Sequence, residues 1–292
     1  MIFDISHRTH YRYSQPVAQS QHVAHMLPRA TPHQVVLSSA LRVDPAPDLR
    51  SETIDSYGNQ VTILDIDTPH EELVLHATSH VKTSLPPPIA AAPRSSWTTA
   101  LVNGPRLPDG TLDLETIQFR SPSRFTPLSP AIADYASPSF ADDASIHDVA
   151  MDITRRIFRD FRFDASATDV STPIEFVLRE RRGVCQDFAH LALACLRSRR
   201  IPARYVSGYI LTRPAPGQPK LQGADASHAW ISVWSTDNGW RDFDPTNGIA
   251  VGEEHVTVAY GADYFDVAPI TGVLLGGGDH SVTVEVDVTP VG

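Results

Sequence analysis

The most constraining feature of the sequence is a run near its middle that is apolar on almost every side of a helix. Helical spacing begins near Cys185, two residues after Gly183, and continues through Phe188, Leu191 and Leu196. A helix that is hydrophobic all round has to be buried. We therefore predict a central helix around which a whole domain packs.

Strand patterns follow this helix. Residues 205–210, 228–234 and 240–244 form three such runs, and turn residues 237–239 separate the last two. Runs of this kind bounded by turn residues predict β-strands. A buried helix followed by a group of strands is typical of an α+β domain.

The first 85 residues predict a separate unit that is rich in strands. Short runs at 2–5, 9–13, 60–66 and 72–78 are separated by turn signals, which is typical of a small β-sandwich-like domain. Prolines are frequent from 86 to 130, which predicts a long connection over the surface. We expect the second domain to cover residues 131–292 and to end with a strand at 281–288.

The charge balance limits the partners of the chain. A formal net charge of −10 opposes binding to nucleic acid, and without a run of about 18 apolar residues we expect no membrane span. The first residues lack the apolar segment of a signal peptide. The two cysteines, Cys185 and Cys195, lie too far apart on one helix to pair. We therefore expect a cytoplasmic protein, and the sequence leaves its oligomeric state open.

Two histidine pairs have a spacing that raises the question of a metal. They are His7 with His10 and His22 with His25. Three residues along a strand put two side chains on opposite faces, which argues against shared ligation by the first pair. Four-coordinate zinc usually draws on cysteine or on tightly grouped histidine. We predict no metal site and no cofactor.

One cysteine, one histidine and one aspartate carry the chemistry that the sequence suggests. Cys185 opens the central helix, where the helix dipole favours a thiolate and free N–H groups can hold an oxyanion. His228 heads one strand and Asp244 ends the next. A base oriented by a carboxylate is the usual means of activating such a thiol. Taken singly, each residue is more often an ordinary core residue.

Four segments in order resemble bacterial transglutaminase-like proteins. Residues 182–190 (RGVCQDFAH) are similar to the nucleophile helix of that family, and residues 201–209 (IPARYVSGY) to the strand that follows it. Residues 227–230 (SHAW) resemble its histidine strand and 243–246 (FDPT) its aspartate segment. The first 85 residues resemble the N-terminal region that often precedes this domain in bacteria.

This resemblance implies a papain-like α+β core in which a nucleophile helix packs on an antiparallel sheet. It assigns the catalytic domain to residues 131–292. It implies Cys185 as nucleophile, His228 as general base and acid, and Asp244 as the orienting carboxylate. The chemistry would be thioester formation at an amide, followed by attack of water or an amine.

The chain departs from the family pattern at one position, and no motif identifies the residues of its substrate cleft. The family resemblance suggests Gly-Arg-Asp-Tyr at residues 261–264, and this chain has Ala262 at the position of the arginine. No side-chain oxyanion donor is evident, since Trp97 lies in the Pro-rich stretch. The residues that could line a substrate cleft are Gln186, Tyr205, Ser207, Tyr209 and Trp230. Aromatic residues on a central strand are, however, more often core residues.

Three functions are compatible with these residues. The first is a cysteine-dependent hydrolase of peptide or protein amides. The second is a transglutaminase that passes a glutamine acyl group to an amine through the same triad. The third is a binding module that keeps the fold without turnover, which the presence of all three residues disfavours.

The triad also predicts the register of one hairpin. For His228 to reach Asp244, the aspartate has to lie opposite His228 or opposite Trp230. A two-residue turn at Asn238 and Gly239 would instead put Asp244 opposite Val233, on the wrong face. We therefore predict a longer loop of about five residues between the two strands.

Overall fold

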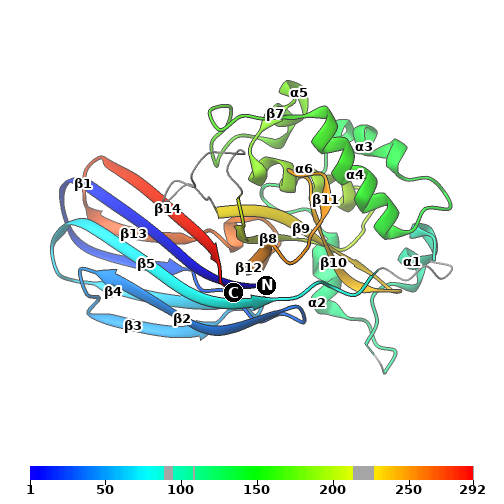
Figure 1. Ribbon diagram of the computed structural model, residues 1–292. Helices are drawn as coiled ribbons and strands as arrows, with labels where there is room; N and C mark the ends of the chain where they lie inside the picture. The colour runs from blue at the N-terminus through cyan, green and yellow to red at the C-terminus, as the bar shows by residue number, and fades with distance from the viewer. Residues whose placement is uncertain (89–94, 108, 213–226, 292) are drawn as a thin grey trace, which may run out of the picture.

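The structure is a computed structural model that describes residues 1–88, 95–107, 109–212 and 227–291. A lobe built only of strands lies beside a second lobe in which helices cover a smaller sheet (Figure 1). The predicted α+β fold is confirmed. No helix in these four ranges has the length and hydropathy that crossing a bilayer requires.

The strand lobe is organised by one long strand, β1 (Ile2–Ala24). The first half of β1 pairs with β5 (His70–Thr83) on one side and β14 (His280–Pro290) on the other. Its second half pairs with β4 (Gln60–Ile66) and β13 (Ile270–Gly276). Two further strands, β2 (Gln34–Asp44) and β3 (Leu49–Ile54), pair with β5 and β4.

Alternating residues of these strands form a core of their own. Leu73 and Leu75 of β5 and Leu64 and Ile66 of β4 are fully buried in one cluster. Because β5 and β4 pair with different halves of β1, this cluster joins two parts of a folded sheet. The period-two pattern therefore produces the sandwich-like unit that the sequence suggests.

The C-terminal boundary of the predicted division is wrong. Residues 131–292 were expected to form one domain, yet β13 and β14 pair with β1 in the N-terminal lobe. Phe3 lies opposite Pro290, so the two ends of the chain lie close together (Figure 1). A strand pattern shows that a segment is extended, but not which strand it pairs with.

The second lobe is a five-stranded antiparallel sheet in the order β11-β10-β9-β8-β12. Helix α6 (Cys185–Arg197) packs on its centre, with α3 (Pro130–Ala136), α4 (Ile146–Asp160) and α5 (Ile174–Glu180) around α6. The strands are β8 (Ala203–Ile210), β9 (Ser227–Ser235), β10 (Gly239–Asp244), β11 (Ile249–Ala250) and β12 (His255–Gly261). All residues of α6 from Asp187 onward are buried, as the apolar pattern predicts.

The Pro-rich stretch 86–130 is more structured than predicted. It holds α1 (Trp97–Asn103), α2 (Leu114–Ile117) and a 3-10 turn, η1 (Gln118–Arg120). Ala100 and Phe119 are buried, so parts of this stretch pack into the molecule. Residues 89–94 and 108 of the stretch lie outside the described residues.

Candidate active site

Cys185 is the first residue of α6 and is half-buried, whereas Cys195 is fully buried in the same helix. The start of the helix is stabilised by Asp187, whose Oδ2 accepts hydrogen bonds from Val184 N at 2.8 Å and Thr168 Oγ1 at 2.6 Å. A Cβ atom at Gly183 would lie 2.6 Å from that same oxygen. The glycine before the helix therefore makes room for the carboxylate that positions its first turn.

The carboxylate of Asp244 is fully buried and accepts five hydrogen bonds. Oδ1 accepts from the backbone N–H groups of Thr246 and Asn247, at 2.9 and 3.2 Å. Oδ2 accepts from His228 Nε2 at 2.8 Å, His255 Nε2 at 3.1 Å and Asn247 Nδ2 at 2.7 Å. Burial raises the pKa of Asp244, but the hydrogen bonds from the two imidazoles and the amide outweigh burial. They hold this pKa well below its usual range.

His228 connects this carboxylate to the thiol. Its Nε2 is bonded to Asp244 Oδ2, and the side chain of Cys185 lies near enough to contribute to its pKa. Burial lowers the pKa of His228, but the hydrogen bonds to Asp244 and Cys185 outweigh burial and raise it to about 10. The three predicted residues thus lie at one site.

The register of the hairpin is as predicted. Phe243 pairs with Ile231 and Trp240 with Trp234, so continuing this register places Asp244 opposite Trp230. His228 is the diagonal neighbour on the same face. The loop is shorter than the five residues expected, because Ser235 and Gly239 already pair and leave three residues between them. Gly239 has a φ of 64°, which a glycine adopts without strain.

His255 is a member of this cluster that no sequence pattern indicates. It opens β12, which is separated from β10 by β9 and β8 in the sheet. Its ring packs edge-on against Trp230, with centroids 5.2 Å apart. Neither a motif nor a short spacing joins residues 244 and 255, so only the tertiary structure reveals the contact.

Within the described residues, one group of side chains could hold a metal ion. It consists of His228, Asp244 and His255, whose ligand atoms lie within 4.8 Å of one another. The hydrogen bonds favour protons over a metal. Asp244 Oδ2 already accepts three N–H donors. The other nitrogen of a metal-bound histidine usually donates to an oxygen acceptor, whereas His255 Nδ1 has no partner among the described residues.

Most of the predicted cleft residues are core residues. Tyr209 is buried and its hydroxyl contacts His7 Nδ1 at 2.9 Å, and Trp230 is fully buried. Tyr205 and Ser207 are also buried, so we correct the prediction for these four. Strand β8 is covered on both faces, which the period-two pattern does not reveal. Gln186, half-buried beside Cys185, stays a prediction.

Two family models and several relatives match the chain. The model of the transglutaminase-like superfamily matches residues 134–245, and that of the bacterial transglutaminase-like N-terminal region matches residues 3–82. An uncharacterized protein of Mycobacterium tuberculosis is 37% identical over 296 residues, which cover 99% of this chain and 92% of the relative. A protein-glutamine gamma-glutamyltransferase of Pseudomonas aeruginosa is 27% identical over 214 residues, or 70% of this chain and 31% of that enzyme.

A solved structure shares the whole fold. The crystal structure of a candidate cysteine protease from Cytophaga hutchinsonii superposes with a TM-score of 0.74 at 23% identity. The superposition covers 99% of this chain and 90% of that one, so it includes the strand lobe and the return of the C-terminal strands. The chain belongs to the transglutaminase-like superfamily and carries the N-terminal region of its bacterial members.

Proposed function

We propose that the protein is a cysteine-dependent hydrolase of peptide or protein amides. The observation that supports the proposal is the position of His228, which is hydrogen-bonded to Asp244 and interacts with the side chain of Cys185. The raised pKa of His228 makes its ring a ready acceptor for the thiol proton. The position of Cys185 at a helix start and its partial exposure fit a nucleophile.

The proposed reaction has two steps. Cys185 Sγ, having given its proton to His228, attacks the carbonyl carbon of the amide, and the C–N bond breaks as His228 returns the proton to the leaving amine. Water then attacks the thioester carbon, gives a proton to His228 and releases the acid, while the sulfur leaves. N–H groups in the first turn of α6 would stabilise the oxyanion of each step.

Transfer to an amine is the second candidate, and it is favoured by the likeness to the Pseudomonas aeruginosa glutamyltransferase. It differs only in the second step, where a primary amine replaces water. The catalytic groups are the same in both functions, so the product has to decide between them.

The test incubates the protein with glutamine-containing peptides and isopeptides, with and without a primary amine, and identifies products by mass spectrometry. Hydrolysis products that form in both conditions support the hydrolase, whereas amine adducts that replace them support the transferase. Cys185→Ala is the inactive control and Cys195→Ala the matched active one. Product formation by Cys185→Ala at the wild-type rate would refute the mechanism.

A further inference from the structure

His255 shares its hydrogen-bond acceptor with the proposed catalytic histidine. Both Nε2 atoms point at Asp244 Oδ2, from 2.8 Å for His228 and 3.1 Å for His255. The His255 side chain is 2% exposed and the Asp244 side chain is fully buried. An interaction between groups this buried is screened little by solvent.

The hydrogen bonds determine where the protons of these rings lie. An ionised carboxylate can only accept, so each imidazole has to present an N–H to Asp244. Nδ1 of His255 is buried and has no partner among the described residues, so a second proton on this ring would be an unpaired buried donor. His255 therefore donates to Asp244 from Nε2, as His228 does.

The surroundings fix the His255 ring in this orientation. Trp230 packs edge-on against it, and the indole ring lies over Gly208, where a Cβ atom would approach Trp230 Cη2 to 2.5 Å. Trp230 itself is held by a hydrogen bond from Nε1 to Asp242 Oδ2 at 3.1 Å. The ring of His255 thus has a rigid support on the side of the sheet that carries the triad carboxylate.

We propose that His255 is a positioning residue of the triad. By donating to Asp244 Oδ2, it holds the carboxylate where that oxygen meets His228 Nε2. The inference rests on the proposed function, because a triad that does no chemistry needs no positioning. It goes beyond that function in adding a fourth side chain, contributed by another strand.

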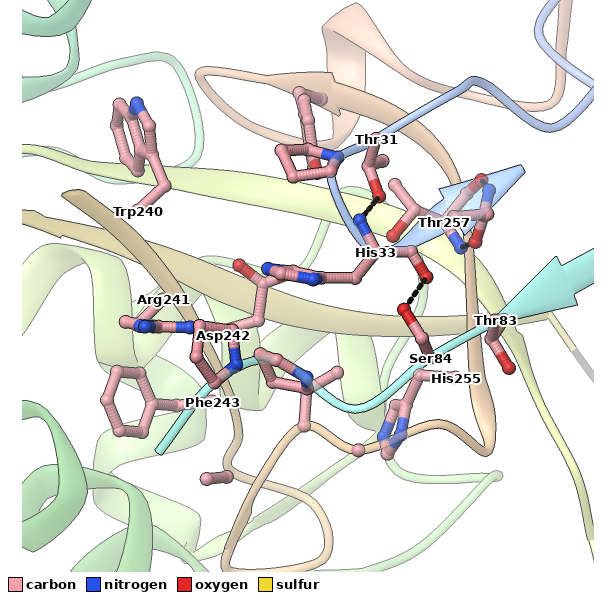
Figure 2. A pocket seen from close by; sticks show the side chains of 18 of the residues that line it. Thr31, His33, Thr83, Ser84, Trp240, Arg241, Asp242, Phe243, His255 and Thr257 are labelled. Atoms are coloured by element: carbon pink, nitrogen blue, oxygen red, sulfur yellow. Dashed lines mark hydrogen bonds between the residues drawn. The ribbon is translucent and has the colours of Figure 1, made fainter. Parts of the chain in front are cut away.

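A cavity makes this proposal testable by chemical rescue. His255 lines a cavity of about 600 Å³ between the strand lobe and the small sheet, together with residues such as His33, Thr83 and Phe243 (Figure 2). Truncation of His255 to alanine would join the vacated space to this cavity. Free imidazole could then enter and place an N–H group near Asp244.

The experiment uses the full chain with three changes at one position. His255→Phe keeps a ring of similar size but removes the donor, His255→Gln keeps an N–H donor, and His255→Ala makes room for imidazole. His25→Phe is the matched control, because His25 is also buried and lies 3.5 Å from a carboxylate, that of Asp55 in the strand lobe. The readouts are kcat and KM for the peptide substrate and the rate of iodoacetamide alkylation of Cys185 at pH 7.

We expect His255→Phe to lower kcat and the alkylation rate about ten- to a hundredfold, the usual range for a hydrogen bond to a charged group, with little change in KM. His255→Gln should recover most of this loss, imidazole should raise the rates of His255→Ala, and His25→Phe should match the wild type. The proposal is overturned if His255→Phe equals the wild type, or if neither glutamine nor imidazole restores the rates. If wild-type Cys185 is itself no more reactive than a free thiol, the proposed function has failed instead.

Discussion

Replacing Asp244 by asparagine removes the charge that keeps His228 protonated. His228 has a pKa of about 10 in place of its usual 6.5, although burial acts in the opposite direction. More than three pKa units correspond to about 5 kcal/mol in favour of the protonated ring. Without the carboxylate, burial is opposed only by the contribution of Cys185, and we expect the pKa of His228 to fall. In Asp244→Asn, an NH₂ group also replaces one of the two carboxylate oxygens. This group cannot accept the N–H hydrogen bonds that the oxygen accepts in the wild type.

The ionisation of His228 can be followed by NMR titration of histidine-labelled protein. The wild-type ring should stay charged through pH 9, whereas in Asp244→Asn it should lose its proton at a clearly lower pH. Alkylation of Cys185 at pH 7 should slow about a hundredfold or more, because a less basic His228 takes up the thiol proton less readily. Asp237→Asn, in the loop of the same hairpin and bonded to Ser95, is the matched control. A His228 that titrates at the wild-type pH in Asp244→Asn would refute this account.

The same change has a consequence for stability. A pKa that folding raises contributes stability that is fully present below the unfolded value of 6.5 and is lost as the pH rises through about 10. The lowered pKa of Asp244 contributes stability above pH 3.8, and this stability is lost on acidification. The excess free energy of unfolding of the wild type over Asp244→Asn should therefore be largest between about pH 4 and 6.5 and should shrink towards pH 10. Denaturant titrations across this range test it, and a difference that grows above pH 8 would contradict the charge assignment.

Three further outcomes are expected from the structure. Limiting iodoacetamide should modify Cys185 before Cys195, since burial raises the pKa of Cys195 to about 12; peptide mapping that finds Cys195 first would contradict this. Cys185→Ala should lose all turnover in the product assay while it keeps the wild-type melting temperature. Gly208→Ala should lower the free energy of unfolding by about 1–3 kcal/mol, since its Cβ would approach Val256 O to 2.2 Å, whereas Gly252→Ala, with nothing closer than 3.9 Å, should be tolerated. Equal melting temperatures for the two glycine variants would show that the sheet yields at Gly208.

The chemistry-bearing residues could be placed from the sequence because each lies in a short local pattern. Cys185 follows a glycine and opens an apolar helix, and His228 and Asp244 lie on two strands joined by a short loop. Their mutual geometry then depends on the register of a single hairpin. Local patterns of this kind are decided by a few neighbouring residues.

The errors arose where distant parts of the chain meet. Strands β13 and β14 pair with β1 although they lie at the opposite end of the sequence, and periodicity carries no information about partners. His255 reaches Asp244 from β12. Arg197 is a further long-range link that no pattern indicates, since this buried arginine donates to backbone oxygens of Phe119, Ala203 and Ala262. Its contact with Ala262 O lies at the position where the family pattern suggests an arginine.

The most direct test of the central claim is to trap the acyl group on the protein. The full chain is mixed with an activated acyl ester, quenched in acid and mapped by mass spectrometry. The account predicts one acyl adduct, on Cys185, which hydroxylamine removes as it removes a thioester and which Cys185→Ala does not form. An adduct on another residue, or wild-type turnover of the ester by Cys185→Ala, would contradict it.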